Sequence, residues 1–395
     1  MMKALEGVRV IDLTQAYSGP FCTMHLADHG AEVIKIERPG MGDQTRDWGP
    51  TKNDCSAYYA FLNRNKKSLE LDLGSQEGKD ILFKLVKDAD VVCENFKVGT
   101  MDKLGVGYEE LKKVNPKIIY ASISGFGLTG PLSKLPAYDI VAQAMSGLMS
   151  ITGFEESGPT KVGPSIGDNY SGAYLTIGIL MALYHREKTG EGQRLDVAMM
   201  DTLYSVLENA IVKYTVGGFV PGQEGNADPS ITPFDSFQAK DGLIVLGVGT
   251  NGLWAKLCKA MGREDLINNP LYENNIKRGD NYLPGLKNEI EAFTKTKTKA
   301  ELEELMVGSG IPFGQILNVG EVSEHPQTKA REMLVEVDHP VIGKMRIQGV
   351  PIKLHNTPGS VDMPAPLLGQ HNEEILAKLG YSKESISELK DKGVI

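Results

Sequence analysis

Hydrophobic and polar positions in the first 125 residues follow two periods in turn. Short runs rich in aliphatic and β-branched residues, typical of buried strands, occupy 8–13, 32–37, 68–73, 91–96 and 117–125. Between them, apolar residues three or four positions apart predict helices. One helix opens at Pro20 and closes at Gly30, and another covers 75–89 with Ser75 as its N-cap. Strands separated by helices predict a parallel sheet with helices on both faces, and a ligand site outside the carboxyl ends of the strands.

The remaining pattern predicts a second domain inserted into the first. Helices predicted over 138–153, 171–190 and about 200–216 complete a large domain whose N-terminal part is 1–216. The segment 217–237 is rich in glycine and proline and is interpreted as a linker and active-site loop. Strand and helix patterns over 238–325 predict a smaller α+β domain, and 326–395 is expected to return to the large domain. The predicted fold class is therefore α/β.

Composition and charge narrow the function classes. The 395 residues are 41% hydrophobic and 24% charged with a net charge of −9, which disfavours a nucleic-acid or membrane partner. No apolar run approaches the length of a membrane span, and the N-terminus does not resemble a signal peptide. The cysteines are far apart and favour reduced thiols in a cytoplasmic protein: Cys22, Cys55, Cys93 and Cys258.

Two motifs have a simple structural interpretation beside a chemical one. The sequence GVGTNG (247–252) fits a dinucleotide fingerprint, but a polar, turn-rich stretch follows it instead of a second strand. A strand–turn–helix corner is therefore favoured. His25 and His29 form an i, i+4 pair without an evident third metal ligand. His29 is explained more simply as a residue that complements a helix C-terminus, so we predict no metal.

Basic clusters follow or precede three predicted strands. They are ERPGMGD (37–43), NRNKKS (63–68) and ENFKVGTMDKLG (94–105). Each cluster alone fits a solvated loop. Together, at strand ends of an acidic chain, they favour a phosphate-bearing anionic ligand.

Asp168 stands in GDNYSG, just ahead of an apolar helix pattern. Capping is the commonest role of an aspartate before a helix. The predicted helix start near Ser171 would also favour a negative charge at this position, as a nucleophilic carboxylate requires. Position along the chain leaves both roles open.

Several blocks, in order from about residue 5 to residue 382, resemble the family III CoA-transferases. This is the CaiB/BaiF family, which includes formyl-CoA transferase and the carnitine CoA-transferases. The blocks are IDLTQAYSGPFCTMHLADHGAEVIKIERPGMGD, NRNKKSLELDL, ENFKVGTMDKLG, YASISGFGLTGP, AYDIVAQAMSG, GDNYSG, GEGQRLDVAMMD and APLLGQHNEEILAKLGYS. The resemblance implies that CoA moves from an acyl-CoA to a free carboxylic acid. Asp168 would be the nucleophile, forming first an anhydride and then an aspartyl-CoA thioester.

The resemblance also implies a binding site and an assembly. The positions that match the CoA site are Ala16, Arg38, Leu71, Asn95, Phe96, Lys103 and Met199. Those that match the substrate pocket are Tyr17, Trp48 and Tyr138. Coenzyme A would be part of the substrate, with no permanently bound cofactor. The family fold is a Rossmann-like large domain and a smaller domain, and two copies form interlocked rings. The loop 225–234, at the expected place of a lid, has one glycine and two prolines and departs from the formyl-CoA transferase pattern.

Two other functions remain as alternatives. A 2-methylacyl-CoA racemase has the same fold but carries a histidine where this chain has Tyr138. Because the unperturbed pKa of tyrosine is about 10, it is a poor base at neutral pH. A non-catalytic acyl-CoA-binding protein would keep its function in an Asp168→Ala variant.

Overall fold

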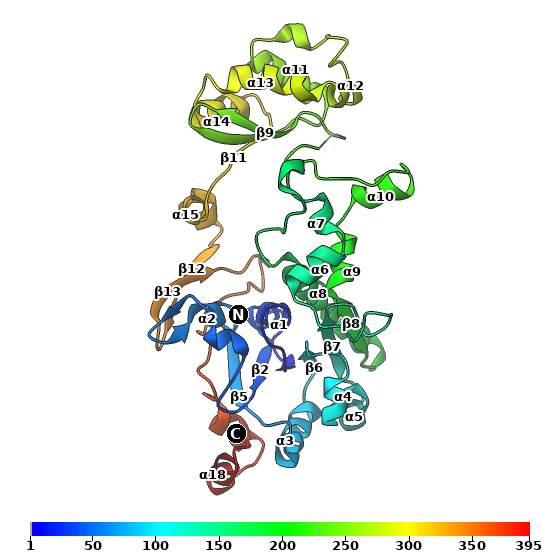
Figure 1. Ribbon diagram of the computed structural model, residues 1–395. Helices are drawn as coiled ribbons and strands as arrows, with labels where there is room; N and C mark the ends of the chain where they lie inside the picture. The colour runs from blue at the N-terminus through cyan, green and yellow to red at the C-terminus, as the bar shows by residue number, and fades with distance from the viewer. Residues whose placement is uncertain (1, 229) are drawn as a thin grey trace. The chain divides into compact units, whose positions relative to one another are not determined.

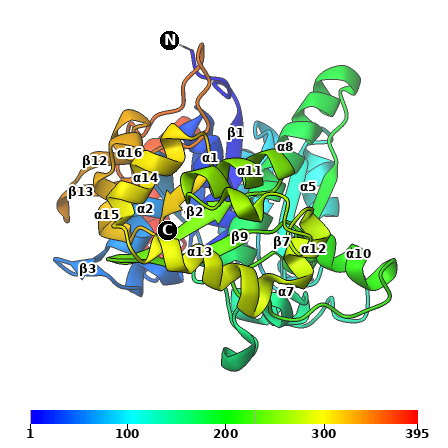
Figure 2. The same ribbon diagram turned by 90° about the horizontal axis from the view of Figure 1, so that it is seen from above.

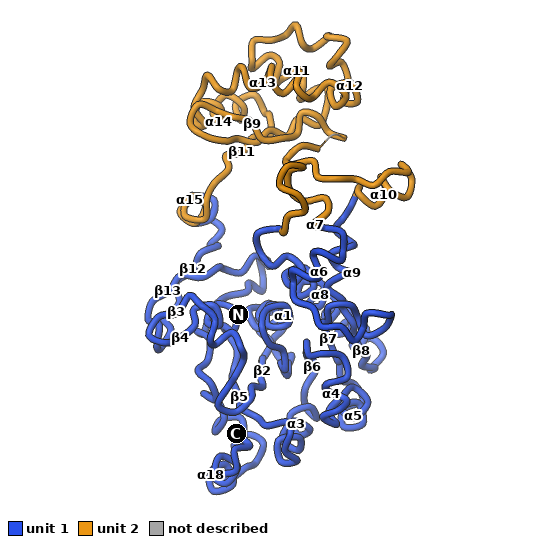
Figure 3. Tube along the Cα trace, in the orientation of Figure 1, with its two compact units in different colours: residues 1–148, 162–208, 326–395 blue, residues 149–161, 209–325 orange. Residues whose placement is uncertain are grey.

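The computed structural model describes residues 2–228 and 230–395 and divides into two compact units (Figures 1 and 3). Unit 1 comprises Met1–Leu148, Val162–Glu208 and Pro326–Ile395. Unit 2 comprises Met149–Lys161 and Asn209–His325. The chain therefore leaves unit 1 twice and returns to it for its last segment.

Unit 1 is built on a six-stranded parallel sheet. Its strands are β1 (Arg9–Asp12), β2 (Glu32–Glu37), β5 (Lys66–Glu70), β6 (Val91–Glu94), β7 (Ile119–Ser124) and β8 (Arg194–Ala198). They lie in the order β5-β2-β1-β6-β7-β8, and every neighbouring pair is parallel. Numbered within the sheet this is 3-2-1-4-5-6, the Rossmann order, so the connections diverge between β1 and β6. The predicted α/β class with a parallel sheet is confirmed.

Helices cover both faces of this sheet. One core lies under α3 (Gln76–Lys87), α5 (Tyr108–Val114), α17 (Asn372–Lys378) and α18 (Lys383–Asp391). The other lies under α1 (Ser18–Asp28), α6 (Asp139–Met145), α8 (Ile166–Thr189) and α9 (Met199–Ser205). Ser75 caps α3 as predicted, since its side chain accepts a hydrogen bond from the N–H of Gly78 at 3.0 Å.

The helix α8 begins at Ile166, five residues before the predicted start, so Asp168 lies inside its first turn. It ends at Thr189, and the left-handed φ of +78° at its C-cap, Gly190, suits glycine. Figures 1 and 2 draw α1 and α8 side by side. The two helices approach so closely at Gly172 that a Cβ there would lie 2.6 Å from the carbonyl oxygen of Ser18. This glycine therefore serves the packing of the two helices.

Unit 2 contains an antiparallel sheet in the order β11-β10-β9. Its elements are β9 (Phe234–Ala239), β10 (Gly242–Gly247), β11 (Phe313–Gln315), α11 (Asn251–Ala260), α13 (Lys287–Thr294) and α14 (Lys299–Gly308). Because β10 pairs antiparallel on both sides, the GVGTNG segment after it is a strand–turn–helix corner and lies in no βαβ unit. The strand β9 starts inside the range interpreted as a linker.

The remaining elements are shorter or peripheral. They are β3 (Thr51–Lys52), β4 (Cys55–Ser56), α2 (Ala57–Leu62), α4 (Thr100–Leu104), α7 (Leu148–Ile151), α10 (Asn209–Thr215), α12 (Asn275–Asp280), α15 (Val319–Glu324), α16 (Pro326–Ala330), β12 (Leu334–His339) and β13 (Gly343–Gln348). Within residues 2–228 and 230–395, no helix has both the length and the apolar character needed to cross a bilayer.

Candidate active site

Asp168 occupies the third position of α8, and its carboxyl group is half-buried. The N-cap residue is Ser165, whose side chain makes no capping hydrogen bond. Burial, and then the negative charge of Asp139, raise the pKa of Asp168 from its usual 3.8 to about 7. A hydrogen bond from the Ser18 side chain acts in the opposite direction. The carboxyl group is thus poised between its two protonation states near neutral pH, which suits a group that takes part in chemistry.

A second acid, Asp139, contacts the same helix start. Its Oδ1 accepts a hydrogen bond from the N–H of Gly167 at 2.7 Å, and its Oδ2 accepts one from Nε2 of Gln143, also at 2.7 Å. The Oε1 of Gln143 in turn accepts from the N–H of Val162 at 2.9 Å. Asp139 therefore satisfies a free N–H of α8 that a cap residue of the helix itself would normally satisfy.

The loop between β1 and α1 is held from several sides. Asn95, which follows β6, accepts from the N–H of Gln15 at 2.8 Å and donates to its carbonyl oxygen at 2.7 Å. This pair of bonds bridges β1 and β6, where the sheet connections diverge. Ala16 has a φ of +62°, unusual for a residue with a Cβ, and its N–H donates to Asp43. The buried ammonium group of Lys35 lies 2.9 Å from Asp43, so an internal ion pair supports the strained turn.

Aromatic side chains surround this loop. Tyr17 donates its hydroxyl hydrogen to Oδ1 of Asn169 at 2.9 Å. Its ring lies 5.5–6.3 Å from those of Phe21, Tyr58 and Phe61, measured between ring centroids. Burial and the charge of Asp168 raise the pKa of Tyr17 to about 12, so its hydroxyl group stays protonated at neutral pH. Trp48 packs against Tyr58 with its centroid 5.5 Å away, and so joins the same wall.

The other residues expected at the site fall into two groups. The side chains of Arg38, at the end of β2, and Lys103, in α4, are exposed and available to an anion. Tyr138 is 66% exposed and precedes α6. The side chains of Leu71 and Met199 are buried in the two cores, where they contribute to packing. Phe96 is half-buried, and its N–H donates to Glu94.

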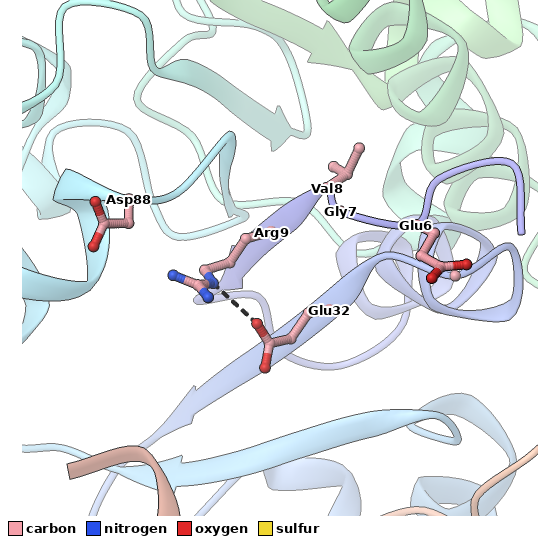
Figure 4. Close-up of a pocket in the computed structure, with 7 residues that line it drawn as sticks. Glu6, Gly7, Val8, Arg9, Glu32 and Asp88 are labelled. Atoms are coloured by element: carbon pink, nitrogen blue, oxygen red, sulfur yellow. Dashed lines mark hydrogen bonds and ion pairs between the residues drawn. The ribbon is translucent and has the colours of Figure 1, made fainter. Parts of the chain in front are cut away.

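A surface depression lies at the edge of the sheet formed by the amino ends of its strands, opposite the edge that carries the loop between β1 and α1 (Figure 4). It sits at the amino ends of β1 and β2, around an ion pair between Arg9 and Glu32 with a 2.9 Å separation. Glu6 and Asp88 add two more acids to its lining. This acidic lining is unsuited to a phosphate-bearing ligand, and the depression is separate from Asp168.

The family pattern described as CoA-transferase family III matches residues 5–372. The chain belongs to CoA-transferase family III. It is 43% identical over 389 residues to the succinyl-CoA:mesaconate CoA-transferase of Haloarcula hispanica, covering 96% of this chain and 97% of that protein. It is 39% identical to the human succinyl-CoA:glutarate CoA-transferase over 396 residues, covering 100% and 90% of the two chains.

A solved structure agrees with this membership. The crystal structure of a CaiB/BaiF family protein from Brucella suis matches with a TM-score of 0.84 and 35% identity, covering 96% of this chain and all of the other. As a family III CoA-transferase, the protein is an enzyme whose substrates are CoA thioesters.

In this family III CoA-transferase, two residues beside Asp168 were not predicted from the sequence to belong to the site. Asp139 directly follows Tyr138 and precedes a helix pattern, which indicates an ordinary cap. Its bond to Gly167 joins residues 28 positions apart, and no local pattern predicts such a contact. Ser18 lies in a turn whose sequence, SGP, points only to a helix start.

Proposed function

We propose that this enzyme transfers CoA from succinyl-CoA to a short dicarboxylic acid, with Asp168 as the covalent nucleophile. The observation that carries the proposal is a half-buried carboxyl group at the carboxyl-end side of a Rossmann-type sheet, with its pKa near 7 and its helix start capped by another residue. The names of two relatives supply the substrate class, because mesaconate and glutarate are both dicarboxylic acids.

A single carboxylate, that of Asp168, is sufficient for every step of the proposed CoA transfer. An oxygen of Asp168 attacks the thioester carbonyl carbon, the C–S bond breaks, and CoA leaves as a thiolate from a mixed anhydride. The thiolate then attacks the Asp168 carbonyl carbon, which releases the donor acid and leaves an aspartyl-CoA thioester. The acceptor carboxylate repeats the two exchanges in reverse. Asp168 returns as a carboxylate, and the acceptor leaves as its CoA thioester.

Surrounding side chains support this route. The hydroxyl groups of Ser18 and Tyr17 stand at Asp168 and its neighbour Asn169 and can donate to negative charge that develops there. The aromatic wall around Tyr17 and Trp48 would limit the access of water, against which an anhydride must be protected. Arg38 and Lys103 would face the phosphates of CoA. For the buried Leu71 and Met199, a role in the CoA site would run through the backbone or the support of neighbouring groups.

The test uses succinyl-CoA with a panel of free acids and mass spectrometry of the CoA products. We expect mesaconyl-CoA or glutaryl-CoA to form, and hydroxylamine to convert Asp168 to its hydroxamate only when donor is present. Asp168→Asn should abolish exchange. Asp201→Asn, a control aspartate at the third position of α9 with an exposed side chain, should retain it. If no acid accepts CoA while a 2-methylacyl-CoA takes up solvent deuterium at its α-carbon, the racemase alternative replaces this proposal.

We infer further that the enzyme is a homodimer. Five side chains of α8, spaced three or four residues apart, form an exposed apolar face: Tyr170, Tyr174, Ile177, Met181 and Tyr184. A face of this kind on a single protomer supports a partner surface. Met181, 67% exposed, is the natural test residue. When the unfolded chain is refolded, Met181→Glu should lower the mass measured by light scattering relative to refolded wild type, whereas an unchanged dimer would exclude this face as its interface.

The interlocked form of the dimer is proposed from the family resemblance. Interlocked rings cannot exchange protomers without opening a chain. Tagged and untagged dimers should therefore stay unmixed in native buffer and mix only after unfolding and refolding. Rapid mixing in native buffer would contradict the interlocked form.

The loop 225–234 and the cellular location also remain proposals. Pro229 lies outside the described residues. Beyond it, the carbonyl oxygen of Thr232 accepts from the buried Arg278 at 2.7 Å, and its N–H donates to Asn275 at 2.9 Å. These bonds support a loop anchored at its second half, with less freedom than a lid requires. A cytoplasmic location agrees with the described free thiols, and fractionation of cells would test it.

A further inference from the structure

Two aspartates lie at the start of α8: Asp139 binds a free N–H group of the helix, and Asp168 does not. An acid at the third position of a helix ordinarily turns back to the free N–H groups of the first turn. In α8, the N–H of Gly167 is taken by Asp139, which lies 28 residues earlier and on another helix. Asp168 is left facing the hydroxyl group of Ser18.

We propose that Asp139, held by Gln143, is a positioning residue for the reaction of Asp168. It caps α8 in place of Asp168 and so keeps the Asp168 carboxylate free to attack the thioester. This inference rests on the proposed function of Asp168 and assigns a second, non-reacting acid to the same step.

The contacts of Asp139 fix both its orientation and its charge. Each of its carboxylate oxygens accepts a hydrogen bond from an N–H group, which is the pattern of an ionised acid. Gln143 is fully buried and has no freedom to turn over, because its Oε1 is engaged by the N–H of Val162. A Cβ at position 167 would lie 3.0 Å from Oδ1 of Asp139, so the glycine leaves room for the bond.

The charge of Asp139 has a second effect on Asp168. The groups that act on Asp168 are Asp139 at the start of α6 and Ser18 at the start of α1. Tyr17, before α1, and Tyr58, in α2, face the charge of Asp168, which raises the pKa of both hydroxyl groups. Of these, Asp139 supplies a negative charge, and this charge helps to raise the pKa of Asp168 to about 7. A more basic carboxylate is a stronger nucleophile towards a thioester, at the cost of being protonated in part of the population at neutral pH.

The experiment is a pH profile of kcat/KM for wild type, Asp139→Asn and the double variant Asp139→Asn/Gln143→Glu. In the single variant, the new amide can still accept from Gly167 but meets the Gln143 amide donor-to-donor. In the double variant, the amide at position 139 donates to the carboxylate at position 143, which also accepts from the N–H of Val162. The series of hydrogen bonds from Gly167 to Val162 is thereby restored, and the negative charge lies at position 143, one hydrogen bond farther from Asp168. We expect the acid limb, where activity rises with pH as Asp168 ionises, to move down by about one pH unit in Asp139→Asn, and by less in the double variant, which keeps a negative charge farther from Asp168. At pH 6 the ionised fraction of Asp168 in Asp139→Asn would then rise about fivefold.

Catalysis at the pH optimum separates positioning from a purely structural role. We expect a lower kcat at pH 8 in Asp139→Asn, with recovery in the double variant and little change in KM. An acid limb that stays at the wild-type pH in both variants would overturn the proposal. Equal losses of kcat and thermal stability in both variants, without movement of that limb, would also overturn it by making Asp139 a structural residue.

A second readout does not depend on CoA transfer. Carbon-13 NMR of protein labelled at the aspartate carboxyl carbon, assigned with Asp168→Asn, reports the titration of Asp168 directly. We expect its midpoint to fall in Asp139→Asn and in the double variant. If the wild type transfers no CoA, the proposed function fails while this titration still decides the effect of Asp139.

Discussion

A half-buried carboxyl group with a raised pKa, such as that of Asp168, should weaken the folded protein at alkaline pH, and Asp168→Asn should remove this weakness. The folded pKa is about 7 and the ordinary value is 3.8. As pH rises from 4 to 7, the unfolded chain releases this proton before the folded protein does. Ionisation of Asp168 thus favours unfolding, and the resulting loss in the free energy of unfolding reaches its full size above pH 7.

The size of the effect follows from the shift. A shift of about 3 units corresponds to a ceiling of about 4 kcal/mol at pH 8.5, of which about 3 kcal/mol develops above pH 5. Because Asp168 is only half-buried and its surroundings can relax, we expect Asp168→Asn to gain about 1–2 kcal/mol over wild type between pH 5 and pH 8.5.

The assay is urea unfolding at pH 5 and pH 8.5, at one protein concentration, for wild type and Asp168→Asn. Asp12→Asn is a matched control with the opposite sign. Burial opposes ionisation of Asp12, but the ammonium groups of Lys66 and Lys35 outweigh it and hold the pKa of Asp12 well below its usual range. Asp12→Asn should therefore destabilise the protein at both pH values. An Asp168→Asn difference that is the same at pH 5 and pH 8.5 would refute the reasoning.

Three further substitutions test the packing that supports the site. Gly172→Ala places a methyl group 2.6 Å from a carbonyl oxygen of α1 and should lower the free energy of unfolding by about 1–3 kcal/mol, while Gly178→Ala, with its nearest neighbour at 3.6 Å, should not. Asp43→Asn removes the carboxylate paired with the buried Lys35, whose ammonium group keeps its bond to the Thr14 carbonyl oxygen, and should cost about 3 kcal/mol in urea unfolding. A loss below about 1 kcal/mol would mean that this ion pair does not support the turn. Arg278→Met removes hydrogen bonds to two backbone carbonyl oxygens and two asparagines and should cost roughly 2–4 kcal/mol. It should also expose residues near 230–233 to proteolysis, and unchanged resistance would contradict the anchored loop.

The sequence predicted those parts of the fold that depend on local periodicity. The strand β2 was predicted with its observed bounds, and the Ser75 cap with its observed bond, because buried strands and caps have strong local signals. The strand β8 was missed, since RLDVA carries charged residues at the exposed positions of a sheet edge. The start of α8 was placed too late, because glycine and asparagine around Asp168 resemble a turn more than a first helical turn.

For the candidate site, too, some features could be predicted from the sequence and others could not. Asp168 and the carboxyl-end location followed from the family resemblance and strand alternation. The bonds that shape the site could not be predicted, because they join residues far apart in the chain: Asn95 with Gln15, and Asp139 with Gly167. Burial could not be predicted either for two of the positions matched to the CoA site, since the side chains of Leu71 and Met199 lie in the cores.

The return of the chain to unit 1 has a consequence for synthesis on the ribosome. Unit 2 is complete once His325 has emerged, whereas unit 1 still lacks α17 and α18. These helices supply Ile375, Leu376, Ile386 and Leu389 to the core that α3 and α5 also cover. At 5–20 residues per second, residues 326–395 take on the order of 3–15 s to translate. During that interval one face of the nascent sheet has α3 and α5 but still lacks α17 and α18, so the unit that begins the chain is the last to finish folding.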